Sequence, residues 1–242
     1  MIKFFRKIRY DLMEKNKTGK YLKYAVGEII LVIIGILIAV SINNWNGDRK
    51  LKLEQQSIFK DLKQEVEENY KALAIAFEGN EKSFQAGKEM KALLYDSEAF
   101  NKMSDSIFDA LVVKMNMNYT YDPQYGILNS IISSGQINQF SNKELKYLLA
   151  SIKELTIDAL EDALKIESQR DELMRSSYNH AYLIKDNIIT GYNIKLLYSH
   201  PDFRWAVHHL FYSVRRDGLE EEKELMTTLE HIIELIDQNI DK

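Results

Sequence analysis

A long apolar stretch near the N-terminus is the strongest feature of the hydropathy pattern. From Ala25 to Trp45 the sequence reads AVGEIILVIIGILIAVSINNW, and Glu28 is the single charged residue in it. A helix rises about 1.5 Å per residue, so this stretch reaches about 30 Å along its axis, which matches the thickness of a bilayer's hydrocarbon core. The pattern therefore predicts a transmembrane helix over residues 24–45.

Apolar residues recur at helical spacings in the chain beyond Gly47. Intervals of three, four and seven residues separate Phe59, Leu62, Val66, Leu73, Phe77 and Phe84. This period predicts one helix of about 45 residues that leaves the membrane span directly and ends near Asp96. Gly79 and Gly87 lower the helix propensity of its middle part, so we expect a kink there.

The rest of the chain contains further helical segments separated by polar breaks. We expect helices at residues 97–114, at 125–132, from 141 to about 189, and at 203–216 and 219–240. Ser141 and Glu144 have the spacing of a capping box, with Ser141 as the N-cap of the longest of these helices. Asp217-Gly218 is expected to separate the last two helices.

The whole pattern favours helices over strands. No stretch of five or more residues alternates convincingly between apolar and polar side chains, as a half-buried strand would. Two prolines and ten glycines in 242 residues also favour long helices over a fold with many turns. The predicted fold class is all-α: one N-terminal transmembrane helix followed by an extracytoplasmic bundle of long antiparallel helices.

The charge distribution indicates how the predicted span is oriented. Residues 1–23 carry eight Lys or Arg and two acidic residues, whereas residues 48–242 carry 24 basic and 33 acidic residues. Because basic residues gather on the cytoplasmic side of a span, we expect a cytoplasmic leader at 1–23 and an extracytoplasmic domain at 46–242. The leader has the spacing of an amphipathic helix that lies on an anionic leaflet, with apolar positions at Ile2, Phe5, Ile8 and Leu12.

The apolar stretch could also be a signal peptide or a core helix. Ala39-Val40-Ser41 offers small residues at a spacing that a signal peptidase accepts, which would make the stretch a cleaved signal peptide. Against cleavage, the basic leader is far longer than a normal n-region, and no polar stretch precedes that triplet. A buried core helix fits poorly with the charge asymmetry and with the aromatic residues Tyr21, Tyr24 and Trp45 at the two ends. An uncleaved anchor is the preferred interpretation.

Four residues of the span are candidates for a membrane or packing role. Glu28 is ionisable, which inside a span suggests a functional site, but it lies about one turn into the apolar run, within reach of the cytoplasmic interface. Gly27 and Gly35 lie eight residues apart on one helix face and would let a second helix approach closely. Trp45 is placed to anchor the outer interface. Interfacial and packing roles are favoured over ion translocation.

The sequence carries no signature of catalysis or of cofactor binding. The absence of cysteine excludes disulfides, thiolate metal sites and cysteine nucleophiles. The ligand spacing of a helical metal site is missing from the histidines, which are His180, His200, His208, His209 and His231. Ser133-Ser134-Gly135 lacks a nucleophile elbow. We therefore expect no catalytic residue, no metal and no cofactor, and we predict that the protein is not an enzyme.

Two further clusters have a structural and a functional interpretation. Glu220-Glu221-Glu222 is expected to lie at the start of the last helix, where negative charge is stabilised by the helix dipole; a cation patch is the alternative. Tyr119, Tyr121 and Tyr125, close to Asp122, are expected to pack over a loop rather than to line a ligand cleft. Neither cluster changes the predicted class of function.

Two segments resemble a known bacterial family. The first is the opening FRKIRYDLMEKNKTGKYLKYAVGEIILVIIGILIAVSINNWN, which combines a basic leader, a Gly-Glu-Ile-rich span and the element Ile42-Asn43-Asn44-Trp45. The second runs from Tyr125 to Asn142, with a Leu-x-Ser-x-x-x-Ser-Gly turn followed by a helix start. Both resemble a family of small single-span membrane proteins classed as a domain of unknown function. The resemblance implies an anchor in the bacterial inner membrane, with a cytoplasmic N-terminus and a periplasmic domain, and it implies no activity.

These observations predict a non-enzymatic, membrane-anchored envelope protein whose helical outer domain binds or organises protein partners. Its expected partners are the lipid bilayer and either another protein or further copies of itself, and the sequence leaves a small ligand unknown. The alternative is an extracytoplasmic sensor or small-ligand-binding module that acts through a partner subunit, because residues 1–23 provide no transmitter. The acidic excess in residues 48–242 argues against nucleic-acid binding.

Overall fold

Helix α2 (Thr18–Leu93) carries both the predicted span and the first long helix of the outer part. The computed structural model describes Tyr10 and residues 18–240, and the protein is 85% helical and 4% strand. The chain divides into two compact units, Met1–Ser57 and Ile58–Lys242. The amphipathic helix expected from Ile2, Phe5, Ile8 and Leu12 lies outside the described residues.

The described part of the first unit is the N-terminal portion of α2, and its apolar side chains are exposed. The most apolar part of the helix is long and apolar enough to cross a membrane, and none of it is buried inside the protein. Ile29, Leu31 and Leu37 each expose more than half of their surface. A core helix of a soluble domain would be largely buried, so that interpretation of the stretch does not fit the structure.

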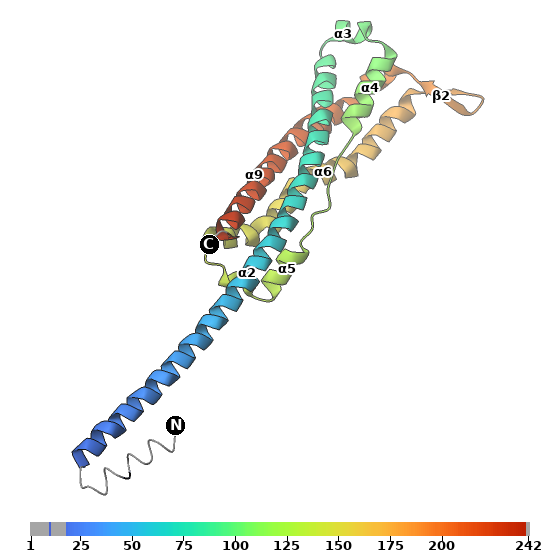
Figure 1. Ribbon diagram of the computed structural model, residues 1–242. Coiled ribbons are helices and arrows are strands. Elements are labelled where there is room, and N and C mark those ends of the chain that lie inside the picture. The colour runs from blue at the N-terminus through green and yellow to red at the C-terminus, as the bar shows by residue number, and fades with distance from the viewer. Residues whose placement is uncertain (1–9, 11–17, 241–242) are drawn as a thin grey trace. The chain divides into compact units, whose positions relative to one another are not determined.

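The second unit is a helical bundle with one short hairpin. After α2 its elements are α3 (Ser97–Lys102), α4 (Asp105–Asn116), α5 (Gly126–Ser133), the 3-10 helix η1 (Gln136–Gln139), α6 (Lys143–Ala181), β1 (Tyr182–Lys185), β2 (Ile188–Tyr192), α7 (Ile194–Ser199), α8 (Pro201–His208), the π-helix η2 (His209–Val214) and α9 (Arg215–Ile240). Side chains of α2 meet those of α9 in opposite chain directions, Lys63 with Asp237 and Tyr70 with Glu230. The long helices α2, α6 and α9 run side by side (Figure 1). The predicted all-α fold with long antiparallel helices is confirmed.

Within the second unit, α2 buries one stripe of side chains with a regular period. Its buried positions include 59, 62, 66, 69, 73, 76, 80, 83, 87 and 90, which are separated by alternating steps of three and four. This seven-residue period keeps one helix face towards its neighbours. Phe59, Leu62, Val66 and Leu73 lie on the stripe, as the sequence predicts. Phe77 and Phe84 are only half-buried, and Asn69 and Asn80 occupy stripe positions that the apolar pattern does not include.

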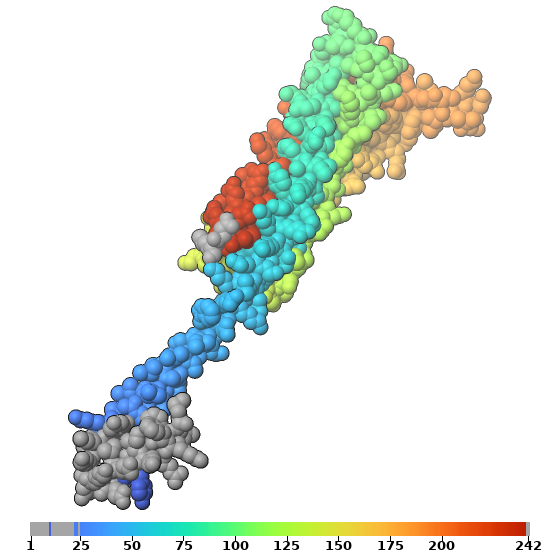
Figure 2. Space-filling model, viewed as in Figure 1, coloured from blue at the N-terminus to red at the C-terminus, as the bar shows by residue number. Residues whose placement is uncertain are grey.

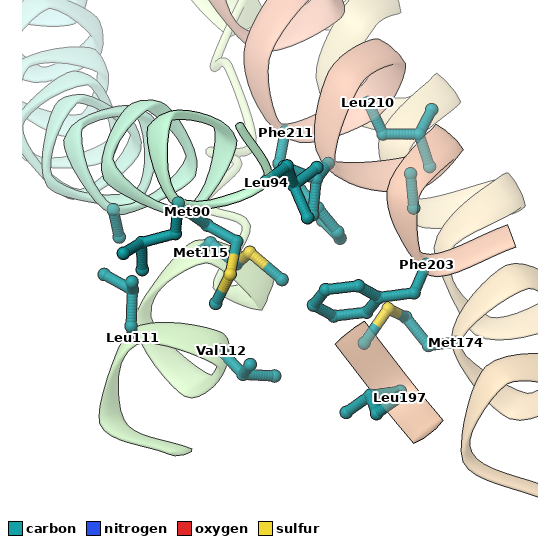
Figure 3. Close-up of a cluster of buried hydrophobic side chains, with 14 of the residues drawn as sticks. Met90, Leu94, Leu111, Val112, Met115, Met174, Leu197, Phe203, Leu210 and Phe211 are labelled. Atoms are coloured by element: carbon teal, nitrogen blue, oxygen red, sulfur yellow. The ribbon is translucent and has the colours of Figure 1, made fainter. Parts of the chain in front are cut away.

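The apolar core of the second unit is divided into two clusters. The first packs the end of α2 against α4, α8 and η2, and includes Met90, Phe108, Phe203 and Phe211 (Figure 3). The second packs the earlier part of this stripe against α5, α6 and α9, and includes Leu62, Leu73, Leu145 and Ile232. Along α2 the second cluster ends at Leu73 and the first begins at Ala86. The buried positions between them belong to neither cluster and include the polar residues Asn80 and Ser83.

The single helix predicted at 97–114 is instead two helices, α3 and α4. Met103, which follows α3, has an extended backbone, and Ser104 takes the N-cap position of α4. Asp96 caps α3, because its Oδ1 accepts a hydrogen bond from the backbone nitrogen of Ala99 at 2.9 Å. The Ser104 side chain makes no capping hydrogen bond, so the extended backbone at Met103 and Ser104 is what separates the two helices.

The predicted capping box of α6 is wrong by one residue. Asn142, and not Ser141, is the N-cap, and its Oδ1 accepts a hydrogen bond from Leu145 N at 3.1 Å. The Glu144 side chain lies 2.9 Å from Nε2 of His231 on α9 and so contributes to tertiary packing. Asparagine caps a helix as well as serine does, so the sequence alone could not separate the two positions.

A β-hairpin replaces the end of the helix predicted to run to about residue 189. The helix α6 ends at Ala181, and β1 then pairs antiparallel with β2, Tyr182 lying opposite Tyr192. Asp186 and Asn187 form the connecting turn with φ values of 53° and 61°. Positive φ at both residues is the conformation of a tight I′ hairpin turn, and Asp and Asn tolerate it better than other non-glycine residues. The strands were missed because they are short and because a bulge interrupts any alternation.

Three glycines lie where helices pack closely. A Cβ atom at Gly87 would lie 2.3 Å from the carbonyl oxygen of Phe211 in η2, and one at Gly218 would lie 3.0 Å from Cβ of Asp162. At Gly79 the added atom would lie 2.5 Å from the ring of Tyr119. The break predicted at Asp217-Gly218 is wrong, because α9 begins at Arg215 and passes through it. Glycine is needed there for packing rather than for a turn.

Candidate functional site

The four span residues predicted from the sequence all lie on α2 in the first unit. Among the described residues nothing lies within 4 Å of a Cβ added at Gly27 or Gly35, so no contact inside the chain requires glycine there. Glu28 is half-buried. The guanidinium of Arg49 lies 6.0 Å from the Trp45 ring, at the limit of a cation–π contact. The roles expected for these residues therefore concern lipid or another helix, and they stay predictions.

A layer of polar side chains, three of them buried and one partly buried, separates the two apolar clusters of the second unit. We call it the polar layer, and it consists of Asn80 on α2, Asn118 after α4, and Arg215 and Glu222 on α9. Asn80, Arg215 and Glu222 expose no more than 2% of their surface. Buried polar groups are costly unless they are hydrogen-bonded, so their partners decide whether the layer is stable.

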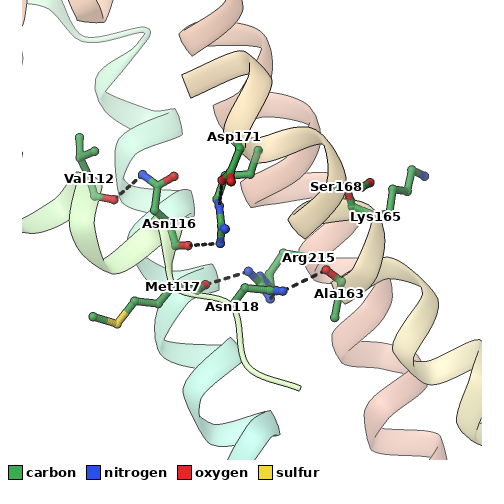
Figure 4. A network of polar contacts seen from close by, with 10 residues as sticks. Val112, Asn116, Met117, Asn118, Ala163, Lys165, Ser168, Asp171 and Arg215 are labelled. Carbon is green, nitrogen blue, oxygen red and sulfur yellow. Dashed lines mark hydrogen bonds and ion pairs between the residues drawn. The ribbon is translucent and has the colours of Figure 1, made fainter. Parts of the chain in front are cut away.

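Neutral oxygen atoms surround the Arg215 guanidinium. Its Nη1 donates hydrogen bonds to Oδ1 of Asn80 and to Oδ1 of Asn118, each at 2.7 Å. Its Nη2 donates to the carbonyl oxygen of Met117 at 2.9 Å, and Asn118 in turn donates to the carbonyl oxygen of Ala163 on α6 (Figure 4). Arg215 thereby joins α2, α6, α9 and the segment that follows α4.

Asn80 uses its whole carboxamide. Its Nδ2 donates to Oε1 of Glu222 at 2.7 Å and to the carbonyl oxygen of Tyr119 at 2.9 Å. Its Oδ1 accepts from the backbone nitrogen of Tyr119 at 3.0 Å and from Arg215. A side chain with two donors and two acceptor sites is thus fully satisfied inside the core.

The same two-point pairing occurs a second time earlier on α2. Nδ2 of Asn69 donates to the carbonyl oxygen of Gln124 at 2.7 Å, and the backbone nitrogen of Gln124 donates to Oδ1 of Asn69 at 2.8 Å. Eleven residues of helix, from 69 to 80, rise about 16 Å, and five extended residues, from 119 to 124, span about 17 Å. Because these lengths match, two asparagines hold a non-helical segment along the helix.

Glu65 completes this attachment at the start of α5. Its Oε2 accepts from the backbone nitrogen of Ile127 at 2.6 Å and its Oε1 from that of Leu128 at 2.9 Å. The first backbone N–H groups of a helix have no partner inside it, and a carboxylate there is also favoured by the helix dipole. A side chain of α2 therefore caps a helix that lies about 60 residues away in sequence.

Burial dominates the electrostatics of the polar layer. It raises the pKa of Glu222 to about 7, although the hydrogen bond from Asn80 and the charge of Arg215 act in the opposite direction. Burial also lowers the pKa of Arg215 to about 10, with the charge of Glu222 opposing this change. Arg215 is still protonated at neutral pH, whereas Glu222 is close to half-protonated there.

A small cavity lies beside the charged groups of the polar layer. Nε of Arg215 and Oε2 of Glu222 make no hydrogen bond within the described chain. Both residues line a cavity of about 10 Å³, together with Asp162 and Gly218. This space fits about one water molecule, which would satisfy a donor and an acceptor at once, and it is far smaller than a substrate site. The polar layer therefore resembles a structural network more than a catalytic one.

The acidic run Glu220-Glu221-Glu222 does not lie at the start of the last helix, where the sequence predicted it. Since α9 begins at Arg215, Glu220-Glu221-Glu222 lies beyond the first turn and is not placed to interact with the helix dipole. Burial, followed by the neighbouring carboxylates, raises the pKa of Glu221 to about 7, and burial also raises that of Asp162. Among the described residues no group of three or more histidine or acidic side chains is arranged to hold a metal ion.

The histidines take part in caps and pairs of the bundle. Nδ1 of His200 accepts a hydrogen bond from Asp202 N at the start of α8, and the rings of His180 and His200 lie 5.1 Å apart. Nε2 of His208 lies 2.9 Å from the hydroxyl of Tyr95. The tyrosine cluster is dispersed: Tyr121 and Tyr125 pack in the second apolar cluster, and the Tyr119 ring lies at Gly79.

The β-hairpin exposes a group of large aliphatic side chains. We call them the hairpin surface: Leu183, Ile184, Ile188 and Ile189, which are 48%, 68%, 65% and 56% exposed. All eight residues from 183 to 190 are exposed, and the hairpin extends away from the helices of the second unit (Figures 1 and 2). Its base is fixed by Tyr192, whose hydroxyl donates to Asp109 on α4; burial and this carboxylate raise the pKa of Tyr192.

A groove lies between α4 and α6. It has a volume of about 340 Å³ and is lined by Val112, Val113, Asn116, Met117, Arg170, Asp171, Met174 and Tyr178. Arg170 forms its polar part, donating to the carbonyl oxygen of Asn116 at 3.3 Å and pairing with Asp171 at 3.0 Å (Figure 4). The groove is an open, largely apolar surface depression on the second unit.

Comparison with known proteins assigns the chain to a family. Residues 28–166, more than half of the chain, match the model of a family of unknown function (DUF6090). The chain belongs to this family. No curated protein and no solved structure matches it. In this DUF6090 protein the matched region includes Asn80, Asn118 and the walls of the groove on α4, while Arg215, Glu222 and the hairpin lie beyond it.

Sequence reasoning missed both the polar layer and the hairpin surface of this DUF6090 protein. A signal existed for the first, because Asn69 and Asn80 continue the steps of three and four that begin at Phe59. A signal existed for the second as well, since Asp186-Asn187 stands between two short segments rich in aliphatic and aromatic residues, YLIK and IITGY. The carboxylate cap supplied by Glu65 has no sequence signal, because its partners are distant in the chain.

Proposed function

We propose that this DUF6090 protein is a non-enzymatic, membrane-anchored envelope protein whose helical second unit binds or organises protein partners. In this proposal residues 24–45 cross the bacterial inner membrane, residues 1–23 stay in the cytoplasm, and residues 46–242 form a periplasmic domain. The exposed hairpin surface is the observation that carries the proposal, since it gives the domain an apolar contact site.

The anchor is supported by the exposure of the most apolar part of α2. None of this part is buried inside the protein, so in water it would expose a long, continuous apolar surface. A bilayer removes that surface from water. The excess of basic residues in 1–23 over the acidic residues there favours a cytoplasmic N-terminus. Gly27 and Gly35 would then face lipid or a second helix.

Partner binding is supported by the composition of the hairpin. A two-stranded hairpin is only marginally stable in water, yet this one exposes four large aliphatic side chains and two unpaired strand edges. Fully burying one such side chain contributes about 1.5–3 kcal/mol, so completing the burial of four half-exposed ones offers about 3–6 kcal/mol before the cost of association. Clustered apolar side chains on a projecting element are typical of an interaction site.

The closed polar layer supports a non-enzymatic role. Glu222 has a pKa of about 7, a value that would suit a general acid or base, but it is buried beside a cavity of about 10 Å³. Catalysis requires the acid or base to reach a substrate, and this cavity fits about one water molecule. The layer has the features of a network that fixes how helices pack.

The anchor is tested by fractionating cells that express the full-length chain. We expect the protein to stay in the membrane pellet after washing with salt and with alkaline carbonate, and its intact N-terminus to be detected by mass spectrometry. A protease added to spheroplasts should remove residues beyond the span and leave 1–23 protected. A soluble product that begins near Ile42 would show a cleaved signal peptide and overturn the anchor.

Partner binding is tested by crosslinking in intact membranes and affinity purification of the tagged full-length protein. We expect a partner, either another protein or a differently tagged copy, to co-purify with the wild type and to be reduced in the variant Ile184→Thr/Ile188→Thr. Threonine keeps the β-branched shape, so the hairpin is retained while its apolar surface is reduced. Equal recovery with both proteins would overturn the proposed role of the hairpin.

The matched control replaces two exposed isoleucines outside the hairpin. Ile75 on α2 and Ile157 on α6 are 72% and 69% exposed, similar to Ile184 and Ile188. The variant Ile75→Thr/Ile157→Thr removes the same amount of apolar surface from helices of the second unit. We expect it to retain the partner, which would assign the loss to the hairpin and not to the overall apolar surface.

The sensor alternative is favoured by one observation, the groove of about 340 Å³, whose size lies within the range of small-ligand sites. The cavity inside the bundle does not favour it. A thermal-shift screen of the full-length protein in detergent against broad metabolite classes tests this alternative. A reproducible shift that is lost in Val113→Lys, a change at an exposed residue of the groove, would support it, and no shift across the classes would remove it.

A further inference from the structure

The groove and the base of the hairpin lie next to each other on the second unit. Tyr178 lines the groove, and its ring centroid lies 6.0 Å from that of Tyr182 and 5.1 Å from that of Tyr192. Tyr192 is also hydrogen-bonded to Asp109 on α4. The hairpin is therefore attached to both α4 and α6, the two helices that form the groove, and its exposed end extends away from them (Figure 2).

The two surfaces match in their apolar character. The groove presents the exposed side chains of Val113 and Met117 above the buried Val112 and Met174, and the hairpin presents four aliphatic side chains. Methionine side chains adapt to the shape of an incoming group, which suits a groove that receives a projecting element. Burial of both surfaces against each other would remove the exposure of each.

The two surfaces also match in charge. The hairpin turn carries Lys185 and Asp186 next to each other, and both are exposed. The groove carries Arg170 and Asp171 next to each other, and the Asp171 side chain is 68% exposed. Arg170 and Asp171 pair with each other at 3.0 Å, and the hairpin charges can join this pair, with Asp186 next to Arg170 and Lys185 next to Asp171, which favours one orientation of docking.

We propose that the hairpin surface of one copy of this chain docks in the groove of a second copy, whose own hairpin docks in the groove of the first. The proposal deepens the proposed function and rests on it, because it names the partner as a second copy of the chain. Each copy contributes the same two surfaces, so the contact is self-complementary and closes as a two-fold dimer.

Two copies can dock in this reciprocal way because the hairpin and the groove lie next to each other on each copy. Because the hairpin and the groove of one copy lie side by side, a single two-fold axis near the C-terminal end of α6 brings both hairpins to both grooves. The eight exposed hairpin residues and the eight groove residues that each copy contributes are fewer than the roughly 20–30 residues a side of a stable interface. We therefore expect a weak dimer that benefits from the high effective concentration of chains anchored in one membrane.

Cysteine crosslinking tests this arrangement without background, because the natural chain has no cysteine. Two full-length single-cysteine variants, Ile188→Cys in the hairpin and Val113→Cys in the groove, are purified with different tags and reconstituted together in liposomes. A short thiol-reactive crosslinker is then added. Since each chain carries one cysteine, a link between positions 188 and 113 can form only between two copies.

We expect the mixture to give a crosslinked heterodimer that contains both tags, with a yield clearly above that of either variant alone. Ile75→Cys is the matched control for the groove position, because residue 75 is exposed but lies outside the groove, and it should give no heterodimer with Ile188→Cys. Asp186→Asn keeps a residue that tolerates the turn and removes one charge. It should weaken dimerisation by about fivefold, the effect of the two exposed ion pairs that the change removes from a two-fold dimer.

Three results would overturn the proposed docking of each hairpin in the groove of the other copy. One is a dominant link between two copies of the Ile188→Cys variant, which would show that hairpins pair with each other. Another is a heterodimer with Ile75→Cys as strong as that with Val113→Cys. The third is a monomer at all lipid-to-protein ratios, measured by single-molecule photobleaching of labelled wild type.

The crosslinking result is distinguishable from the test of the proposed function. If no link forms between positions 188 and 113 while Ile184→Thr/Ile188→Thr still loses a partner in the affinity purification, a different protein occupies the hairpin and the proposed function stands. If the hairpin variant loses no partner and no link forms, both are overturned. Circular dichroism of each variant shows whether the helical bundle is folded, so that a loss of contact is not assigned to unfolding.

Discussion

Asn80 on α2 is hydrogen-bonded to both backbone polar groups of Tyr119, through Nδ2 to the carbonyl oxygen at 2.9 Å and through Oδ1 from the backbone nitrogen at 3.0 Å. The carboxamide therefore takes the place of a neighbouring strand for a segment that belongs to neither helix nor sheet. Asn69 repeats the arrangement with Gln124. The segment between α4 and α5 is thus held by side chains of α2 where its own backbone has no regular partner.

We predict that both asparagines are needed for stability and that Asn80 matters more. In Asn69→Ala the partly buried backbone N–H and C=O of Gln124 lose their partners, which should cost about 1–2 kcal/mol. In Asn80→Ala the partners in Arg215 and Glu222 are lost too, so the cost should be larger. Denaturant unfolding of the full-length protein in mild detergent, followed by circular dichroism, measures both.

The exposed Asn101 on α3 provides the control for these variants. We expect Asn101→Ala to change the free energy of unfolding by no more than about 0.5 kcal/mol. If Asn69→Ala or Asn80→Ala were equally mild, the paired hydrogen bonds would not be what attaches the segment to α2.

Glu222 should make the protein less stable as the pH rises. Its pKa is about 7 when folded and near 4.5 in the unfolded chain, so its contribution is fully present below pH 4.5 and is lost as the pH rises through about 7. The difference corresponds to about 3 kcal/mol at most. Glu222→Gln removes this titration, and we expect its stability to fall less than that of the wild type between pH 5 and pH 8.

Denaturant unfolding at several pH values gives the free energy of unfolding of the wild type and of Glu222→Gln. The difference between the two profiles removes the contribution of every group that titrates in both proteins. The exposed Glu224 on the same helix is the matched control. Because it is solvated in both states, Glu224→Gln should follow the wild-type profile. A Glu222→Gln profile parallel to that of the wild type would mean that Glu222 stays ionised inside the core, against the effect of burial.

Gly87 should be among the least replaceable glycines of the bundle. A Cβ atom there would lie 2.3 Å from the carbonyl oxygen of Phe211, a backbone atom that moves only if η2 moves. We expect Gly87→Ala to destabilise the second unit by about 1–3 kcal/mol, although alanine favours a helix more than glycine does.

Gly47→Ala, also on α2, is the control for this prediction. Among the described residues a Cβ atom at Gly47 has nothing within 4 Å, so only the gain in helix propensity applies. The melting temperature of the second unit should fall in Gly87→Ala and stay unchanged in Gly47→Ala. Unchanged melting of both variants would contradict the close approach of α2 and η2.

The hairpin turn should respond to the backbone conformation required at Asn187. Its φ is 61°, a value that a β-branched residue adopts only with strain. We expect Asn187→Val to open the hairpin while the bundle stays folded, and Asn187→Gly to preserve it. Hydrogen exchange should show faster exchange of strand amides in Asn187→Val alone, with an unchanged melting temperature. Equal exchange in the two variants would argue against the tight turn.

The sequence predicted the helices well and their ends less well. Steps of three and four from Phe59 onwards predicted the long helix correctly, because the buried face of a helix repeats along the chain. Phe77 and Phe84 were wrongly assigned to the buried face of this helix. They fit the helical period but lie beside the buried stripe. The N-cap of α6 differed by one residue, because Ser141 and Asn142 are equally good caps.

By itself the sequence determined the apolar stretch and its charge asymmetry, the helical class and the family, because these depend on composition and on spacing along one segment. The tertiary structure decided which polar side chains are buried together. Asn80, Arg215 and Glu222 are far apart in the chain, and their hydrogen bonds exist only once α2 and α9 pack antiparallel. The structure also decided that glycine at positions 87 and 218 serves close packing, since the need for a missing side chain is set by the neighbour that occupies its space.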